Sequence, residues 1–312
     1  MAVPEPVLLT GATGFVGRAI LAELAARGIP VEAVSRHDRP DSAGVRWHRA
    51  DLLDPEDRTR LIGLSRATRL IHAAWYVEHG AFWYDALNAD WRAASLDLAR
   101  LFLAGGGRRI VGIGTCAEYL TEPHGLAPWP EMRAIAPTTP YGMAKALLHS
   151  QMEELSREAG ASLVWARLFH LYGPGEHPAR FVPALLAALA EGRPAEVRAA
   201  DLVRDFASTA HVARCIVALL KTDANGAFNI GSGAPRSLGA LARIMAEAVG
   251  ADAGLSLKHA PGPGDPPVMI PDLSRLFATT GLTPEDVDKG LSRFAKDQVA
   301  ARTRAAHAAS RN

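Results

Sequence analysis

A tyrosine and a lysine four residues apart, Tyr141 and Lys145, are the side chains whose types and spacing best suit chemistry. The apolar pattern of residues 141–158 predicts a helix, on which this separation places both side chains on one face. Because a nearby ammonium stabilises a phenolate, we expect Lys145 to lower the pKa of Tyr141. Tyr141 would then be a proton donor and acceptor near neutral pH.

Thr115 closes a predicted apolar strand that begins at Ile110. The carboxyl ends of strands in a parallel sheet face the ligand crevice. A hydroxyl at that edge can hydrogen-bond a substrate oxygen beside Tyr141. A threonine standing alone there would be better explained by a hydrogen bond to local backbone.

Three glycines, Gly11, Gly14 and Gly17, follow the short apolar strand 7–9 and open a predicted helix at 15–26. Their spacing in a strand–turn–helix unit predicts a dinucleotide-binding turn. Gly11 permits the tight turn, Gly14 lets the backbone approach a pyrophosphate, and Gly17 lets helix and strand pack closely. Free N–H groups at the helix N-terminus would bind the phosphates.

The residues after the second predicted strand, 31–34, bear on which dinucleotide is bound. Ser35 and Arg36 stand there, with Arg39 close by and Arg18 just after the glycine turn. An acidic residue at this place would bind the ribose 2′-hydroxyl of NAD. A hydroxyl and guanidinium groups suit a 2′-phosphate instead. We therefore expect NADP, with NAD as the alternative.

Strand-like and helical segments alternate through the first half of the chain, which predicts an α/β fold with a Rossmann-type doubly wound parallel sheet. After about residue 168, loops rich in Pro and Gly separate helices expected at 181–190, 209–220, 238–249 and 285–306. We expect an NAD(P)-binding domain at 1–167, to which parts of about 206–231 return. A smaller, discontinuous α/β substrate lobe would occupy 168–312.

The composition excludes several classes of function. The 312 residues include 34 basic and 33 acidic ones, and the formal net charge of +1 gives no attraction for nucleic acid or a membrane surface. The longest helix-like apolar run, 184–190, is too short to span a bilayer. The two cysteines, Cys116 and Cys215, form neither a disulfide framework nor a zinc-ligand pattern. We expect a cytoplasmic protein with no metal and no nucleic-acid or membrane partner.

Further motifs follow the glycine turn in a fixed order. They are Asp51-Leu52, His72-Ala73-Ala74, Asn88, Thr115, Tyr141 with Lys145, Arg167, Tyr172-Gly-Pro-Gly175, Arg204-Asp205-Phe206 and Asn229-Ile-Gly231. Over roughly residues 5–295 the chain resembles the extended short-chain dehydrogenase/reductases, specifically the NAD(P)-dependent nucleotide-sugar epimerase/dehydratase branch. The resemblance implies a catalytic triad of Thr115, Tyr141 and Lys145. It also implies a nucleotide-diphosphate sugar as substrate, and a homodimer built from helices 89–104 and 141–158.

The expected binding residues combine the motifs with what the resemblance implies for each. Those for the cofactor are Gly11, Thr13, Gly14, Phe15, Val16, Gly17, Ser35, Arg36, Arg39, Asp51, Leu52, Ala73, Ala74, Tyr141, Lys145, Leu168 and His170. Those for the substrate are Trp75, Cys116, His170, Arg180 and Arg204. Asp51 and Leu52 would border the adenine, and Arg204 resembles the family arginine that contacts the sugar nucleotide.

Departures from the family pattern narrow the choice of reaction. In the 4,6-dehydratases an Asp-Glu pair follows the catalytic threonine, whereas Cys116 and Ala117 stand here and replace neither carboxylate. Glu118 comes one position too late, which argues against a dehydratase. The cysteine of the GDP-fucose-synthase type would fall at Ala117, so we interpret Cys116 as buried and inert.

Two further departures concern anion binding. His170 stands where many relatives have Asn in Arg-x-x-Asn-x-Tyr-Gly-Pro. It is expected to bind the substrate diphosphate, to act as an acid or base, or to be a structural histidine, and the sequence leaves these open. In the segment 261–265, Gly262 stands where relatives often carry a phosphate-binding Arg. Arg180 is the best candidate replacement.

Aromatic residues gather in one stretch, namely Trp75, Tyr76, Trp83, Tyr84 and Trp91. They are expected to form a wall of a sugar pocket, because aromatic faces pack on sugar rings. For Trp91 we favour helix packing at a dimer interface.

The favoured function is NADPH-dependent reduction of a nucleotide-linked 4-keto-6-deoxy sugar, with Tyr141 as the proton donor. The alternative is a nucleotide-sugar 4-epimerase with tightly held NAD. A non-catalytic NADP-binding regulator is the third hypothesis, because a fold alone does not fix a function.

Overall fold

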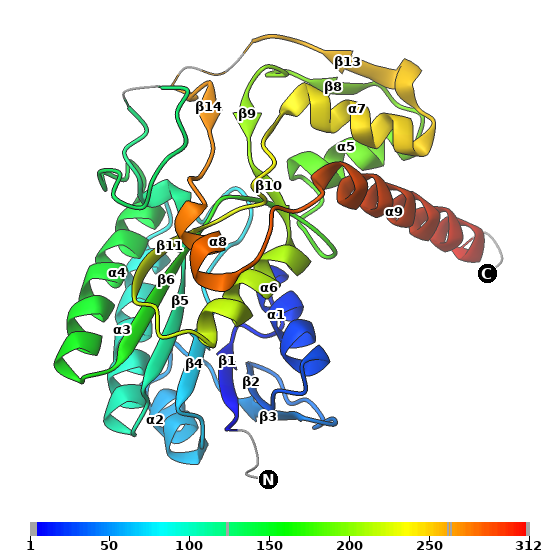
Figure 1. The fold of residues 1–312 in the computed structure, drawn as a ribbon. Coiled ribbons are helices and arrows are strands. Elements are labelled where there is room, and N and C mark those ends of the chain that lie inside the picture. Colours follow the sequence, from blue (N-terminus) through cyan, green and yellow to red (C-terminus); the bar gives the residue numbers. More distant parts are fainter. Residues whose placement is uncertain (1–4, 123–124, 261, 263, 310–312) are drawn as a thin grey trace.

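A seven-stranded parallel sheet forms the centre of the computed structural model, which describes residues 5–122, 125–260, 262 and 264–309 (Figure 1). The strand order is β11-β6-β5-β4-β1-β2-β3. The strands are β1 (Val7–Thr10), β2 (Val31–Ser35), β3 (Val45–Arg49), β4 (Arg69–His72), β5 (Arg109–Thr115), β6 (Ser162–Leu168) and β11 (Gly226–Ile230). The order reverses between β1 and β4, so a ligand crevice is expected at their carboxyl ends.

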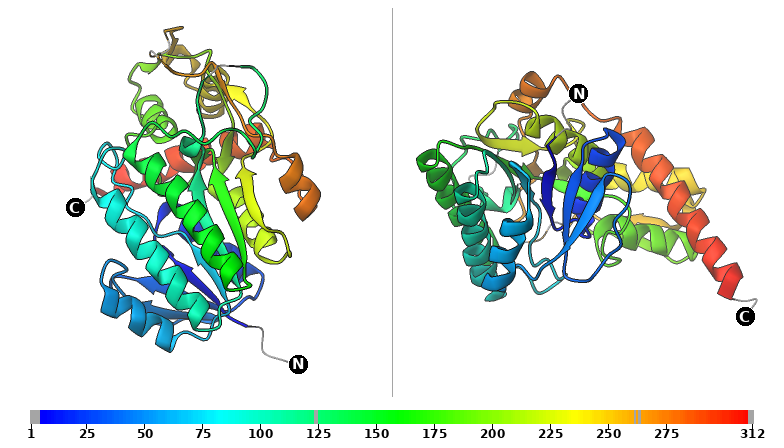
Figure 2. Two further views of the ribbon diagram at one scale, coloured as in Figure 1. Left: turned by 90° about the vertical axis from the view of Figure 1, so that its left-hand side faces the viewer. Right: turned by 90° about the horizontal axis from the view of Figure 1, so that it is seen from below.

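Helices cover both faces of this sheet (Figure 2). One face carries α1 (Phe15–Ala26), α6 (Thr209–Leu220) and α8 (Ser274–Thr280), and the other carries α2 (Pro55–Leu64), α3 (Leu87–Ala104) and α4 (Pro140–Glu158). Successive side chains of a strand point to opposite faces. Leu9 accordingly packs in the cluster with Ile20 and Ile216, whereas Leu8 packs in the cluster with Leu98.

A smaller lobe follows the sheet and has its own core. Its helices are α5 (Phe181–Ala190), α7 (Leu238–Val249) and α9 (Val287–Ala309), whose buried residues include Val182, Met245 and Leu291. Short strands complete it: β8 (Ala195–Val197) with β13 (Leu255–Leu257), β7 (His170–Tyr172) with β10 (Phe206–Ser208), and β9 (Val203–Arg204) between β12 (Arg236–Ser237) and β14 (Val268–Met269). Single 3-10 turns lie at η1 (Cys116–Glu118) and η2 (Asp252–Gly254).

The predicted fold class is confirmed. Helices α5, α6 and α7 have the predicted bounds, and α9 begins and ends two to three residues later than predicted. Strand β11 returns to the sheet and pairs with β6 in parallel. Helix α8 and the strands of two or three residues were not predicted. Within the described ranges, no helix has the length and apolarity needed to cross a membrane.

Candidate active site

The glycine turn lies at the carboxyl end of β1, where its backbone packs too closely for side chains. Gly11 has φ +68°, and a Cβ there would lie 2.6 Å from the Ala74 nitrogen. A Cβ on Gly17 would lie 1.9 Å from the Gly11 carbonyl oxygen. Helix α1 has Gly14 as its N-cap, with no side chain bonding the first turn. Its N–H groups are therefore available to phosphate oxygens, and the turn fits a dinucleotide cofactor.

The backbone after β4, which faces the glycine turn, is held by a buried chain of hydrogen bonds. The Thr10 hydroxyl lies 2.8 Å from His72 Nδ1 and accepts from the Ala74 N–H at 3.3 Å. His72 Nε2 lies 2.8 Å from the Ser95 hydroxyl. Burial lowers the pKa of His72 to about 3, so the ring is neutral. Thr10 and His72 thereby hold the cleft-lining Ala73 and Ala74 in place, a role that the sequence motifs did not assign to them.

The residues expected at the far end of the cofactor follow β2 and β3. The Ser35 hydroxyl accepts from the His37 N–H at 3.2 Å. Arg36 is exposed, and the Arg39 guanidinium lies 5.2 Å from the centre of the Trp47 ring. Asp51 follows the next strand, where its carboxylate accepts from the Leu53 N–H at 3.0 Å. These side chains thus follow the carboxyl ends of β2 and β3.

Thr115, Tyr141 and Lys145 come together where β5 ends and α4 begins. Thr139 caps α4 by accepting from the Gly142 N–H at 3.1 Å, which places Tyr141 in the first turn. The Thr115 side chain reaches the Tyr141 side chain, whose pKa it lowers against the larger effect of burial. Lys145 Nζ donates to the Ile113 carbonyl oxygen at 2.9 Å. The strand end and the helix start therefore position all three groups.

The expected lowering of the Tyr141 pKa is wrong. Burial raises the pKa of Tyr141, and the Thr115 side chain and the charge of Arg180 oppose this rise. The Lys145 ammonium donates to the Ile113 carbonyl and lies 3.8 Å from the centre of the Trp75 ring, a cation–π contact. Burial lowers the pKa of Lys145 to about 7, against the opposing charge of Glu118.

Aromatic rings enclose Tyr141. The rings of Phe82 and Trp83 lie edge to face with it at centroid distances of 4.9 and 5.4 Å, and Trp75 lies at 6.4 Å. The Trp83 carbonyl also accepts from the Tyr141 N–H at 3.2 Å. Trp91 lies on α3, 6.3 Å from Trp75, and so packs within the same chain. The aromatic stretch therefore shields the phenol from water.

Arg180 and Arg204 act on His170 through their charges, and Arg180 also acts on Tyr141. Arg204 is 6% exposed and donates to the Val203 and Pro266 carbonyls, each at 2.9 Å. Burial and the charges of Arg204 and Arg180 lower the pKa of His170 to about 3. The charges of Arg180 and Arg204 thus both reach His170, and these three residues are among those predicted to bind the substrate.

The three hypotheses for His170 are narrowed by its surroundings. A ring with this low pKa is neutral at pH 7 and is no general acid. The ring stacks on Phe206 at 5.2 Å, and Nε2 is buried with no hydrogen-bond partner among the described residues. A buried polar atom left unpaired costs free energy, so this nitrogen is suited to a ligand contact.

Glu176 lies in the same region and was missed by the sequence motifs. Its Oε2 is buried and, in the described part of the chain, has no hydrogen-bond partner. Burial raises the pKa of Glu176 to about 7, against the charge of Arg180. The loop after β7 that carries it also stacks His177 on His79 at 4.4 Å. The one available signal was an acidic residue directly after the Tyr172–Gly175 motif.

The side chains that follow Thr115 provide no second acid–base group. Burial raises the pKa of the Cys116 thiol to about 12, so the thiol stays protonated. The Glu118 carboxylate is fully buried and accepts from Arg167 Nε at 2.8 Å. Pro261 and Pro263 lie outside the described residues, and the charge of Asp265 acts on Arg204. Among the described residues, no three His, Cys, Asp or Glu side chains converge as a metal site.

Comparison with known proteins agrees with this geometry. The model of the NAD dependent epimerase/dehydratase family matches residues 7–231. The chain is 30% identical to dTDP-6-deoxy-L-talose 4-dehydrogenase (NAD(P)(+)) of Kitasatospora kifunensis, covering 79% of this chain and 80% of that protein. It is 28% identical to dTDP-glucose 4,6-dehydratase of Streptomyces griseus, covering 80% of each.

A solved structure shares the whole fold. UDP-N-acetylglucosamine 4-epimerase from Methanobrevibacter ruminantium M1 superposes with a TM-score of 0.84 at 20% identity, over 96% of this chain and 100% of that one. The chain belongs to the NAD dependent epimerase/dehydratase family, whose members are NAD(P)-dependent enzymes that modify nucleotide sugars.

Proposed function

We propose that the protein reduces the C4 ketone of a nucleotide-linked 4-keto-6-deoxy sugar with NADPH. The observation that carries this proposal is the meeting of Thr115, at the end of β5, with Tyr141, in the first turn of α4, while the protonated thiol of Cys116 follows Thr115 in the chain. Reduction of a ketone needs one proton donor beside the hydride, whereas elimination of water needs further acid–base groups. Tyr141 is suited to the first role, and Cys116 and Ala117, which follow Thr115, supply no carboxylate for the second.

In the proposed reaction NADPH supplies the hydride to C4. Tyr141 gives its proton to the developing alkoxide, and Thr115 hydrogen-bonds the same oxygen. Lys145 stabilises the resulting phenolate through its positive charge. Arg180 and Arg204 hold the diphosphate, and the neutral His170 ring hydrogen-bonds it through Nε2. The rings of Trp75, Phe82 and Trp83 keep water from the transferred proton.

The test is NADPH consumption by the purified protein with dTDP-, UDP- and GDP-linked 4-keto-6-deoxy sugars. We expect oxidation of NADPH that depends on the sugar. If the protein instead releases stoichiometric NAD on denaturation and interconverts C4 epimers without added cofactor, it is an epimerase. Binding of NADPH with no turnover of any nucleotide sugar would identify a regulator.

The choice of NADP rests on Ser35, Arg36 and Arg39 at the end of β2. We expect the double variant Arg36→Gln/Arg39→Gln to weaken NADPH binding about tenfold and to leave NADH binding unchanged, because a 2′-phosphate loses its guanidinium partners. The exposed Arg293→Gln serves as a matched control on α9. Equal losses for the two cofactors would overturn the assignment.

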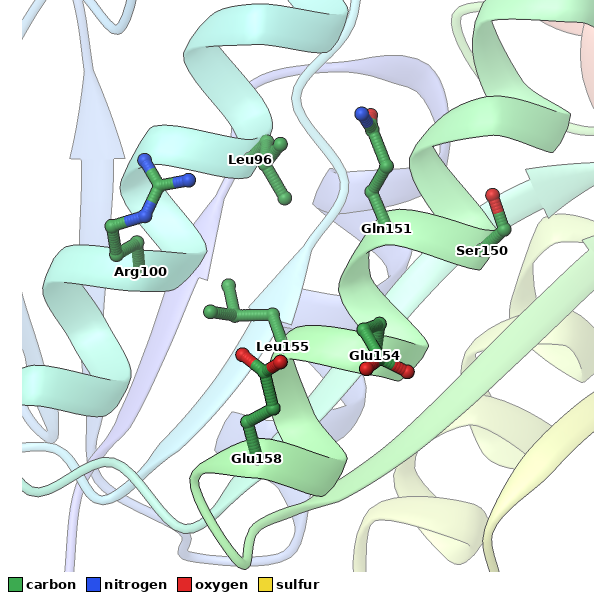
Figure 3. Close-up of a pocket in the computed structure, with 7 residues that line it drawn as sticks. All are labelled: Leu96, Arg100, Ser150, Gln151, Glu154, Leu155 and Glu158. Carbon is green, nitrogen blue, oxygen red and sulfur yellow. The ribbon is translucent and has the colours of Figure 1, made fainter.

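We also propose that the protein is a homodimer that uses α3 and α4, which lie side by side (Figure 2). Leu96 and Leu155 form the apolar floor of a groove between the two helices, with Arg100, Glu154 and Glu158 around it (Figure 3). If α3 and α4 packed against the same two helices of a second copy in a four-helix bundle, this apolar floor would be covered. Light scattering should give twice the monomer mass for the wild type and the monomer mass for Leu96→Glu/Leu155→Glu.

A further inference from the structure

Glu118 is a buried carboxylate directly behind the catalytic threonine. Its Oε1 accepts from the Thr115 N–H at 2.8 Å and from Trp165 Nε1 at 3.0 Å, and its Oε2 accepts from Arg167 Nε at 2.8 Å. The carboxylate is 0% exposed and the Arg167 side chain 3%. Glu118 and Thr115 form a capping box around the turn η1, so the carboxylate fixes the backbone from which the Thr115 hydroxyl projects.

Further hydrogen bonds hold this carboxylate in a single position. Arg167 Nη1 donates to the Tyr119 hydroxyl at 3.1 Å, and that hydroxyl donates to Asn229 Oδ1 at 2.7 Å. The Asn229 amide donates to the Trp129 carbonyl at 2.8 Å. A buried ion pair needs this degree of hydrogen bonding to be tolerated. The carboxylate therefore cannot swing into the crevice to act as an acid or base.

Lys145 lies on the other side of the same strand end. Its ammonium donates to the carbonyl of Ile113, two residues before Thr115, and lies 6.0 Å from the ring of Trp165, the indole that donates to Glu118. Lys145 is 4% exposed. Burial disfavours its charged form, and the charge that opposes burial is that of Glu118.

We propose that Glu118 is a positioning residue of the hydride-transfer site, which holds Thr115 through its backbone and places a buried negative charge behind the strand end to which Lys145 is hydrogen-bonded. This inference rests on the proposed function for its catalytic consequence. Without that charge, the buried lysine would lose its proton at a lower pH, and the phenolate of Tyr141 would lose its cationic neighbour. The enzyme would then lose activity at neutral pH although Thr115, Tyr141 and Lys145 were all present.

The experiment measures the protonation of Lys145 directly, without a substrate. Only the neutral amine reacts with an acylating reagent, so the extent of Lys145 labelling at each pH, read by mass spectrometry, gives its titration midpoint. The charge-removing variant is Glu118→Gln, whose amide oxygen still accepts from the Thr115 N–H. The matched control is Glu131→Gln, which neutralises a carboxylate that accepts from the Asn229 N–H in the same network.

We expect Glu118→Gln to raise the acid dissociation constant of Lys145 about tenfold, and Glu131→Gln to leave it unchanged. The fall of kcat at high pH should move to lower pH by the same amount. A folded Glu118→Gln protein with the wild-type midpoint would overturn the inference. If the single variant does not fold because Arg167 is left unpaired, the midpoint of Glu118→Gln/Arg167→Gln is compared with that of Arg167→Gln, from which it differs only in the Glu118 charge.

The two proposals can fail separately in this design. A shifted Lys145 midpoint in a protein that reduces no nucleotide sugar would uphold the inference and refute the proposed function. NADPH-dependent turnover with an unshifted midpoint would uphold the proposed function and refute the inference.

Discussion

Two polar walls flank Tyr141, and they differ in how completely they are hydrogen-bonded. On the sheet side, Glu118, Arg167, Tyr119 and Asn229 bond one another and leave few polar atoms unpaired. On the lobe side, His170 Nε2 and Glu176 Oε2 are buried without partners among the described residues. Burying a polar atom unpaired costs about 1–3 kcal/mol. The sheet-side wall therefore has its polar groups paired within the fold, whereas the unpaired atoms of the lobe-side wall suit the ligand contact proposed above.

Substitutions in the two walls should therefore affect different properties, namely stability and substrate binding. Changes in the paired wall should lower the free energy of unfolding and affect catalysis through position. Changes in the unpaired wall should leave the free energy of unfolding nearly unchanged and weaken the binding of substrate. Tyr141 lies between the walls and should show a purely chemical effect.

The largest expected effect is that of Tyr141→Phe. Removing the hydroxyl removes the proton donor, and we expect kcat to fall about 10²–10⁴-fold with NADPH affinity unchanged. Steady-state kinetics and thermal unfolding would be measured together. Tyr84→Phe is the matched control, because Tyr84 is a tyrosine of the aromatic stretch that is 74% exposed. Full turnover by Tyr141→Phe would refute every enzymatic assignment made for this site.

The next effect is on stability, in the paired wall. Arg167→Met should lower the free energy of unfolding by about 3–5 kcal/mol, because Glu118 is left as a buried, uncompensated charge. Urea unfolding followed by circular dichroism measures it. The exposed pair of Arg157 and Glu154 offers the control, since Arg157→Met removes a surface ion pair and should change little. A loss as small as that of the control would mean that the wall does not stabilise the fold.

A smaller effect is expected in the unpaired wall. Arg204→Met should raise the KM for the nucleotide sugar about 10–100-fold, since a charge-assisted contact to the diphosphate is lost. Unfolding should change less than for Arg167→Met, because Arg204 donates to carbonyls rather than to a buried carboxylate. Arg198→Met, on an exposed side chain of the same lobe, is the control. An unchanged KM would show that the diphosphate lies elsewhere.

The sequence predicted those parts of the molecule that local patterns determine. Helices α5, α6 and α7 have apolar spacing throughout, and their bounds were predicted correctly. Strands β9, β12 and β14 have two residues each, too few to show a period, and pairing between distant segments creates them. The contact of Thr115 with Tyr141 also joins distant segments, but the order of the motifs along the chain predicted it.

What the motifs could not predict are contacts that depend on packing between segments far apart. Glu118 and Arg167 are 49 residues apart, and nothing in either local sequence indicates that they pair. The i,i+4 spacing places Lys145 on the same helix face as Tyr141, but the ammonium reaches the Ile113 carbonyl and the Trp75 ring instead. Burial, which no motif encodes, then determines the direction of the Tyr141 pKa.

The smallest expected effect is a pH dependence in the unpaired wall. Glu176, with a pKa of about 7, loses its proton as pH rises through neutrality and adds a negative charge beside Arg180. Affinity for UDP-glucose, whose diphosphate does not titrate in this range, should therefore fall about two- to fivefold between pH 6 and pH 8. Calorimetry at several pH values measures it.

Glu176→Gln should abolish this slope and hold the affinity near its low-pH value, because the amide stays neutral throughout. His177 follows Glu176 directly in the chain and stacks on His79, so His177→Gln is the matched control and should keep the slope. If Glu176→Gln retains the slope and His177→Gln loses it, the pH response belongs to the histidine pair. The carboxyl group of Glu176 would then have no part in binding the diphosphate, and the unpaired wall would be reduced to His170 and the two arginines.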